Sequence, residues 1–257
     1  MKNHYRLVSL LIFVTLQCVA QSGTLYDNFE KKVLNQTLWY STCGGFSVTE
    51  NCSTDTQDEH LHLARGLTGN NDSNSGTNGG AATVFFVGPV AITSITADIL
   101  VRRIDEVSCA ANPVGFGGHA DIIARFFSSG DGTTNGDVGA TIFIGRSASD
   151  PKGQLGVIGN YFNNGDYSHT VWLANVQMGT PITASLTWDQ ANHRFLYSVT
   201  NKVTHITNTG ILAYPFSDTT PAADGEKHLD VEIFPDNCTS NSTWVHADAL
   251  FDNVYVH

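Results

Sequence analysis

The sequence has 257 residues, of which 24 are acidic and 13 basic, so its formal net charge is −11 at neutral pH. An acidic surface repels phosphate groups, which argues against nucleic acid and anionic membranes as partners. Hydrophobic residues make up 41% of the chain, yet beyond the N-terminus no run approaches the ~18 apolar residues of a membrane-spanning helix. We therefore expect a protein with a sizeable buried core and no membrane span.

The first 20 residues are typical of a secretory signal peptide. Lys2 and Arg6 form a short basic region, and an apolar run follows from Leu7 to Leu16. The small residues Cys18 and Ala20 then stand at positions suited to cleavage. We expect this segment to be removed and the protein to be secreted, either to the extracellular space or, in a bacterium, to the periplasm. The segment carries two of the 13 basic residues and none of the 24 acidic ones, which gives the mature chain a net charge of −13.

The mature chain keeps four cysteines, an even number that agrees with an oxidising compartment. They are Cys43, Cys52, Cys109 and Cys238, and four cysteines allow three pairings. Cys43 and Cys52 are close in sequence, so we expect a local crosslink between them and a second one between Cys109 and Cys238. A zinc site would need closely spaced pairs of cysteine or histidine ligands, and the cysteines here have no such spacing.

Short runs of alternating apolar and polar residues, separated by glycine and small polar residues, predict strands along the whole mature chain. In chain order the clearest runs are 60–63, 82–87, 95–103, 121–127, 140–145, 182–188, 194–200, 230–234 and 244–256. With the segments before and between them, we predict about eleven strands and a hairpin turn at 189–192. No run has the period of an amphipathic helix. The pattern favours an all-β fold in which residues 21–257 form one two-sheet antiparallel sandwich or jelly roll.

Three segments carry a resemblance to a known superfamily. Residues 25–30 with Leu38 and Trp39 are similar to the first strand of the concanavalin A-like lectin/glucanase superfamily, and residues 249–256 resemble its last strand. Residues 182–195 are similar to a hairpin of its laminin-G-like and pentraxin-like members. The resemblance implies a concanavalin A-like jelly-roll sandwich with its first and last strands side by side.

In such a sandwich the aromatic residues of the first and last strands close the core. We expect Phe29 and Trp39 to pack against Phe251 or Tyr255. Because this superfamily includes lectins, glycosidases, lyases and adhesion modules, the resemblance does not select one activity.

The leading functional hypothesis is a secreted, lectin-like carbohydrate-binding or adhesion domain without catalytic activity, whose partner is a polysaccharide or another glycan. The first alternative is a secreted polysaccharide-degrading enzyme, either a glycoside hydrolase or a polysaccharide lyase, with its active site on the concave face. The second alternative is a structural or protein-interaction module. Convergence of the candidate catalytic residues in one groove would favour the enzyme, and exposed aromatic rings in a groove would favour a carbohydrate ligand.

The candidate catalytic residues are carboxylates and one histidine. Asp230 and Glu232 share one face of a predicted strand, as the acid and nucleophile of a glycosidase could, or as part of a solvated strand face. Asp121 is a third acid on a predicted strand. His60 shares a strand face with His62 and could act as a base or bind a metal, or simply form a polar outer face.

The candidate sugar-binding residues are aromatic rings and an arginine. Tyr161, Tyr167 and Trp172 are interleaved with asparagine and aspartate, a composition that can stack on a pyranose ring and bond its hydroxyl groups. The same composition fits an edge strand whose aromatic rings face the core. Arg125 shares a strand face with Asp121, so it could bond sugar hydroxyl groups or form an ion pair.

The resemblance also implies a structural calcium ion between the first and last strands. The oxygen ligands expected there are Asp27, Glu30, Asp248 and Asp252. Ordinary acidic surface is the alternative for these four residues.

Overall fold

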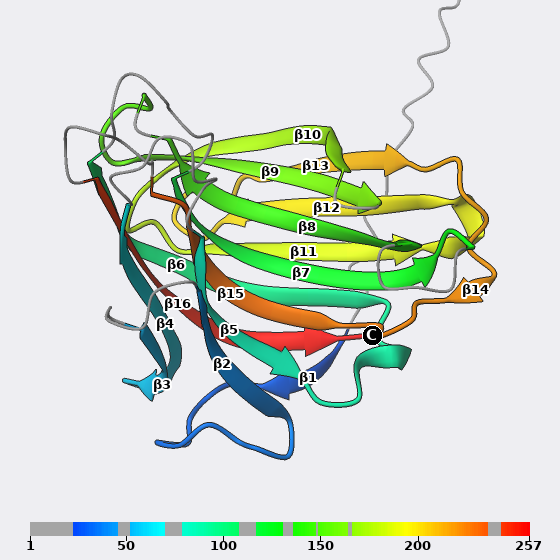
Figure 1. Ribbon diagram of the computed structural model, residues 1–257, viewed down its shortest axis with the longest axis horizontal. Helices are drawn as coiled ribbons and strands as arrows, with labels where there is room; N and C mark the ends of the chain where they lie inside the picture. The colour runs from blue at the N-terminus through cyan, green and yellow to red at the C-terminus, as the bar shows by residue number, and fades with distance from the viewer. Residues whose placement is uncertain are drawn as a thin grey trace, which may run out of the picture.

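The computed structural model describes eight stretches of the chain, which are residues 23–45, 52–69, 79–107, 117–130, 136–147, 149–163, 166–235 and 243–257. The signal peptide predicted over residues 1–20 lies outside them. The described stretches contain sixteen strands in two antiparallel sheets (Figure 1). Two 3₁₀ helices lie wholly within the described stretches, η1 (Pro89–Ala91) and η3 (Gln190–Asn192). Neither is long and apolar enough to cross a membrane, and no other helix of the described stretches is.

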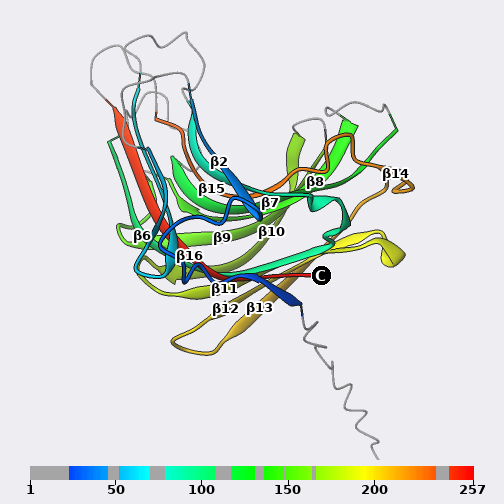
Figure 2. The same cartoon turned by 90° about the horizontal axis from the view of Figure 1, so that it is seen from below.

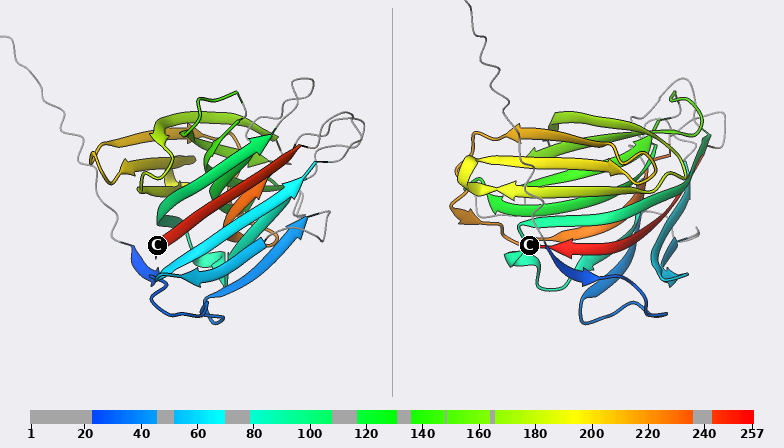
Figure 3. Two further views of the ribbon diagram at one scale, coloured as in Figure 1. Left: turned by 90° about the vertical axis from the view of Figure 1, so that its left-hand side faces the viewer. Right: turned by 180° about the vertical axis from the view of Figure 1, so that it is seen from behind.

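Sheet A forms the back of the molecule in Figure 1 and is seen face-on in the right-hand view of Figure 3. Its strands are β1 (Thr24–Asp27), β3 (Cys52–Gln57), β4 (His60–Thr68), β6 (Ser94–Val107), β11 (Ile182–Asp189), β12 (Arg194–Asn201), β13 (Thr207–Ala213) and β16 (Trp244–Val256). They are ordered β13-β12-β11-β6-β16-β4-β3, and β1 pairs with the end of β16.

Sheet B packs against sheet A and is curved, with its outer face on the inside of the curve (Figure 2). We call this outer face the concave face. Its strands are β2 (Trp39–Gly45), β5 (Gly80–Phe86), β7 (Gly118–Ser128), β8 (Asp137–Arg146), β9 (Gln154–Asn163), β10 (Asp166–Gln177), β14 (Thr220–Pro221) and β15 (Lys227–Ile233). They are ordered β10-β9-β8-β7-β15-β5-β2, and β14 pairs with β7.

The prediction of an all-β, two-sheet antiparallel jelly-roll sandwich is confirmed, and the hairpin predicted at 189–192 is the β11–β12 connection through η3. The count of about eleven strands is too low, because short edge strands were missed. β3 and β13 lie at the two edges of sheet A, and most of their residues are half-buried or exposed. An edge strand that is exposed to solvent on both faces lacks the alternation of apolar and polar residues by which strands are predicted.

The first and last strands pair as predicted, but the aromatic packing differs in part. Trp39 is fully buried, its Nε1 donates to Asp27 Oδ2 at 2.8 Å, and its ring centroid lies 4.5 Å from that of Phe86. Phe29 packs on Trp39, whereas the prediction paired both of them with Phe251 or Tyr255, and it follows β1 instead of lying in it. Tyr255 does not close the core, since 39% of it is exposed. A side chain on the outer face of a strand cannot reach the opposite sheet.

Cys43 and Cys52 form the predicted disulfide. It joins β2, at the edge of sheet B, to β3, at the edge of sheet A, so it ties the two sheets together on one open side of the sandwich. Cys109 and Cys238 lie outside the described residues, and their pairing stays a prediction.

Replacing both Cys43 and Cys52 with alanine should lower the free energy of unfolding by about 2–4 kcal/mol, since the crosslink restricts the unfolded chain. Urea denaturation of both proteins under non-reducing conditions measures the difference. Equal unfolding midpoints and slopes would show that the crosslink contributes nothing to stability.

Candidate functional site

Strand β15 places three polar side chains on the concave face. Its residues Leu229, Val231 and Ile233 point into the core between the sheets. Because successive side chains of a strand point to opposite faces, His228, Asp230 and Glu232 point the other way.

Strand β7 lies beside β15 and brings two more polar side chains to the same place. In the antiparallel register Asp121 is opposite Asp230, and His119 is opposite Glu232. Three of the four candidate catalytic residues therefore come together. The fourth, His60, lies on β4 in sheet A, where its Nε2 is 4.0 Å from Asp252 Oδ2.

His119 is the centre of this cluster, although it was not among the predicted catalytic residues. Its Nε2 lies 3.1 Å from Asp121 Oδ2 and 3.4 Å from Glu232 Oε2. Burial lowers the pKa of His119, but the charges of Asp121 and Glu232 outweigh this effect and raise it to about 10. The His-Ala-Asp spacing of residues 119–121 could have revealed the residue, since it repeats the Asp-Val-Glu spacing of 230–232.

His228 forms a second buried pair beside the first. Its Nδ1 lies 2.9 Å from Glu226 Oε1, and its Nε2 lies 3.4 Å from Asp230 Oδ2. Burial lowers its pKa, yet the two carboxylates raise it to about 10. Both Asp121 and Asp230 are almost completely buried, and burial raises the pKa of each above its ordinary range. The concave face therefore holds an unusual density of ionisable groups out of contact with water.

Aromatic rings and glycines shape the space around these groups. The ring of His119 stacks on Phe234 at 5.7 Å and meets the edge of Phe143 at 4.9 Å. A Cβ atom at Gly145 would lie 2.6 Å from the Cβ of His119, so only glycine leaves room for the histidine there. Gly156 has the same role for Trp172, whose ring would lie 2.6 Å from an added Cβ.

A cleft of about 400 Å³ opens above this cluster. It is lined by His119, Ile123, Arg125, Phe143, Phe162, Tyr167, His228, Glu232 and Phe234. Glu232 is the most accessible carboxylate of the cluster, with 30% of its side chain exposed, whereas Asp121 and Asp230 lie beneath the lining. Burial, together with the charges of Glu232 and Asp121, raises the pKa of Tyr167 to about 12. Tyr167 is therefore a neutral hydrogen-bonding ring at neutral pH.

Of the predicted sugar-binding residues, Tyr167 and Arg125 line this cleft, and Trp172 lies on the same face. Tyr161 does not, because it belongs to the core between the sheets and only 2% of it is exposed. Its neighbour Asn160 takes the concave face, so the strand alternation sends Tyr161 inward. Arg125 contacts Asp224 at 3.6 Å, on the loop before β15.

The four acids predicted to bind calcium are not brought together, which corrects that expectation. Asp27 accepts hydrogen bonds from Trp39 and from the backbone of Phe29. Asp248 is held by Arg102 through two bonds of 2.7 and 2.9 Å. Among the described residues, the one group of three potential metal ligands within 4.8 Å of one another is His119, Asp121 and Glu232. Neither Glu30 nor Asp252 belongs to it.

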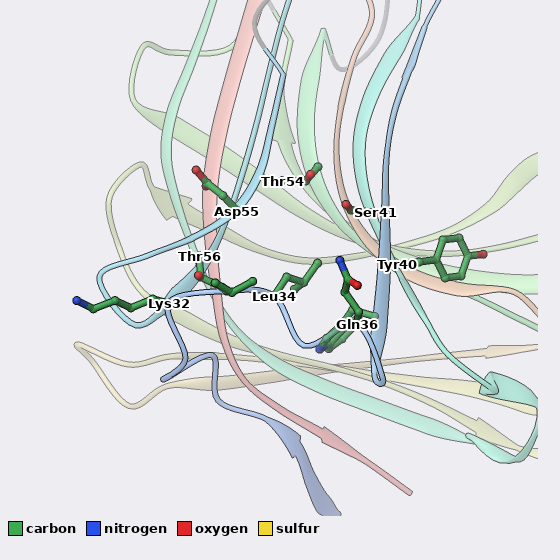
Figure 4. A pocket seen from close by; sticks show the side chains of 10 residues that line it. Lys32, Leu34, Gln36, Tyr40, Ser41, Thr54, Asp55 and Thr56 are labelled. Atoms are coloured by element: carbon green, nitrogen blue, oxygen red, sulfur yellow. The ribbon is translucent and has the colours of Figure 1, made fainter.

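A second cleft, of about 620 Å³, lies between β2 and β3 on the open side of the sandwich (Figure 4). Ser41, Thr54 and Thr56 line it, while the side chains of Lys32 and Tyr40 point away from the others in Figure 4. Asp55 is its one carboxylate, so this larger cleft lacks the converging charged groups of the concave face.

No family model matches the sequence, and no curated protein matches it. Solved structures that align with the chain include basic winged bean lectin with Tn-antigen, at 10% identity over 91% of this chain and 99% of that one, with a TM-score of 0.45. Lectin II from Ulex europaeus aligns at 13% identity over 89% and 97%, with a TM-score of 0.41. Scytalido-glutamic peptidase with a peptide-based transition-state analogue aligns at 11% identity over 71% and 75%, also with a TM-score of 0.41. These identities and TM-scores are low, so the ligand of this chain has to be argued from its own site.

Proposed function

We propose that this protein is a secreted carbohydrate-binding domain that holds a polysaccharide on the concave face of sheet B. The observation that carries the proposal is the presence of exposed aromatic rings and charged hydrogen-bonding groups on that one face. Tyr167 is 44% exposed and Trp172 is 55% exposed, and the cleft beside them is lined by Glu232 and Arg125. A pyranose needs both kinds of group, since its faces are apolar and its rim carries hydroxyl groups.

The aromatic surface continues to the other side of the sheet. Phe85 meets the ring of His228 at 5.0 Å, and Tyr40 stacks on Phe85 at 4.7 Å with ring planes 7° apart. β10 and β2 are separated by six strand spacings of ~4.8 Å, so this row spans roughly 30 Å. A surface of that length suits a chain of sugars better than a single one.

Replacing Trp172 or Tyr167 with alanine should weaken polysaccharide binding by roughly tenfold each, because each removes a stacking surface worth about 1.4 kcal/mol. A polysaccharide array selects the ligand, and isothermal titration calorimetry measures the dissociation constants. Tyr255→Ala is the matched control, since Tyr255 is an exposed tyrosine on sheet A. Equal binding by all four proteins, or no binding of any glycan by the wild type, would contradict the proposal.

A hydrolase is the second candidate, and one observation favours it. The carboxylates of Asp121 and Glu232 approach within 4.8 Å, close to the ~5 Å separation of the acid pair in retaining glycosidases. Against it, the complete burial of Asp121 leaves Glu232 as the carboxylate that reaches the cleft. Release of reducing ends without unsaturated products from the bound polysaccharide, abolished by Glu232→Gln, would establish this alternative and show that the protein is catalytic.

A further inference from the structure

Three side chains with metal-binding atoms converge on the concave face. The register of β7 and β15 puts His119 opposite Glu232, and Asp121 follows two residues along on the same face. His119 Nε2 lies 3.1 Å from an oxygen of Asp121 and 3.4 Å from an oxygen of Glu232. A tetrahedral shell with metal–ligand bonds of about 2.0–2.2 Å places neighbouring ligand atoms roughly 3.3–3.6 Å apart. These two separations are close to that range.

These close contacts are not satisfied as hydrogen bonds. Within the described structure, both oxygens of Asp121 and both ring nitrogens of His119 lack a hydrogen-bond partner of acceptable geometry. The Asp121 side chain is 0% exposed and that of His119 is 6% exposed, so water does not replace the missing partners from bulk solvent. An unpartnered buried carboxylate is costly, and a bound cation offsets that cost.

Asp230 is a third carboxylate next to His119, Asp121 and Glu232, and within the described part of the chain it also has an oxygen without a hydrogen-bond partner. Asp230 is directly opposite Asp121 on the concave face, its side chain is 2% exposed, and its Oδ1 has no hydrogen-bond partner among the described residues. Asp121, Asp230 and Glu232 therefore bring three carboxylates to adjacent positions of β7 and β15, beside His119 and His228. Like charges at this spacing repel, and in the metal-free chain the protonated imidazoles of His119 and His228 offset that repulsion, a role that a bound cation can take over.

We propose that His119, Asp121 and Glu232 bind a divalent transition-metal ion, with Zn²⁺ as the best chemical match. An imidazole nitrogen with two carboxylate oxygens is a ligand set that Zn²⁺ accepts, whereas Ca²⁺ prefers six to eight oxygens. Asp230 supports the site from the adjacent position on β15. A tetrahedral ion with three protein ligands has one free coordination position. Because Glu232 lines the cleft, we expect this free position to face the cleft.

The proposal goes beyond carbohydrate binding and does not depend on it, because metal binding is measured without a glycan. The full chain, stripped with a chelator that is then removed, is titrated with Zn²⁺ by calorimetry. We expect one Zn²⁺ per chain and a higher melting temperature, since the ion binds only the folded state. Substitution of Co²⁺ should give the visible absorption of a cobalt ion with a histidine ligand. No stoichiometric Zn²⁺, or binding of Ca²⁺ in its place, would overturn the assignment.

Two variants that replace a carboxylate with its uncharged amide test where the ion binds. Glu232→Gln and Asp121→Asn should each weaken Zn²⁺ binding by more than the roughly 10–100-fold that losing a supporting partner costs a metal site. Asp248→Asn is the matched control, because Asp248 also contacts a histidine, His62, at 3.5 Å, but on sheet A. Circular dichroism checks that each variant is folded. Unchanged Zn²⁺ affinity in folded Glu232→Gln would place the ion elsewhere and refute the site. If a variant does not fold, the wild-type titration and the Co²⁺ spectrum still decide.

Discussion

Trp39→Ala should lower the free energy of unfolding by about 4 kcal/mol, which is a large part of the stability of a single domain. The indole is completely buried among Tyr26, Phe29 and Phe86, so its removal leaves a cavity where the start of the chain meets sheet B. It also leaves Asp27 Oδ2 without the donor that holds it at 2.8 Å. Urea denaturation followed by circular dichroism measures the change.

Two control variants divide this effect into its parts. Trp39→Phe keeps most of the ring but removes the hydrogen bond, so it should cost less than Trp39→Ala. Trp172→Ala removes a tryptophan that is 55% exposed and should change stability by less than about 1 kcal/mol. Similar losses for Trp39→Ala and Trp172→Ala would show that the aromatic cluster beside β1 does not support the fold.

Lys227→Met should change how stability depends on pH. Lys227 is 1% exposed, and its ammonium donates to the carbonyl oxygens of Arg125 and Gly225, with no carboxylate in salt-bridge contact among the described residues. Burial lowers its pKa from the ordinary lysine value of 10.5 to about 8, although the charge of Asp224 opposes this. The folded chain therefore gives up this proton at a lower pH than the unfolded chain does.

The sign of the effect follows from proton counting. Between pH 8 and 10.5 the unfolded state binds more protons at this lysine than the folded state, so this group's contribution to stability rises with pH. The stability of the wild type minus that of Lys227→Met should rise by about 3 kcal/mol across this window and stay constant below it. Taking the difference between the two proteins cancels the other groups that titrate there. A flat or falling difference would mean that the ammonium is not destabilised by burial.

The sequence predicted the fold class because alternation is a local signal. It also predicted that Asp230 and Glu232 share a strand face, for the same reason. The convergence of β15 with Asp121 and His119 could not be predicted, since the register of two strands far apart in the sequence depends on the packing of the whole sheet. The sequence contains no local pattern that indicates this register.

Two site predictions failed because the sequence does not show which way a side chain points or which donor it bonds. Tyr161 was placed with Tyr167 and Trp172 because composition does not show which strand face a residue takes, and its own face is the core. The four acids were grouped by the resemblance of the terminal strands. In the structure, local donors such as the Trp39 indole and the Arg102 guanidinium satisfy Asp27 and Asp248 separately.

The position of β16 has a consequence for how the protein is made. This strand comes last in the sequence but lies inside sheet A, between β6 and β4, where Figure 3 shows it in red. Until the ribosome has released residues 244–256, β6 and β4 lack the strand that joins them, and the sheet is split in two. Sheet A therefore cannot form completely before residues 244–256 are available, and the long-range pairing that completes it is of the slow kind.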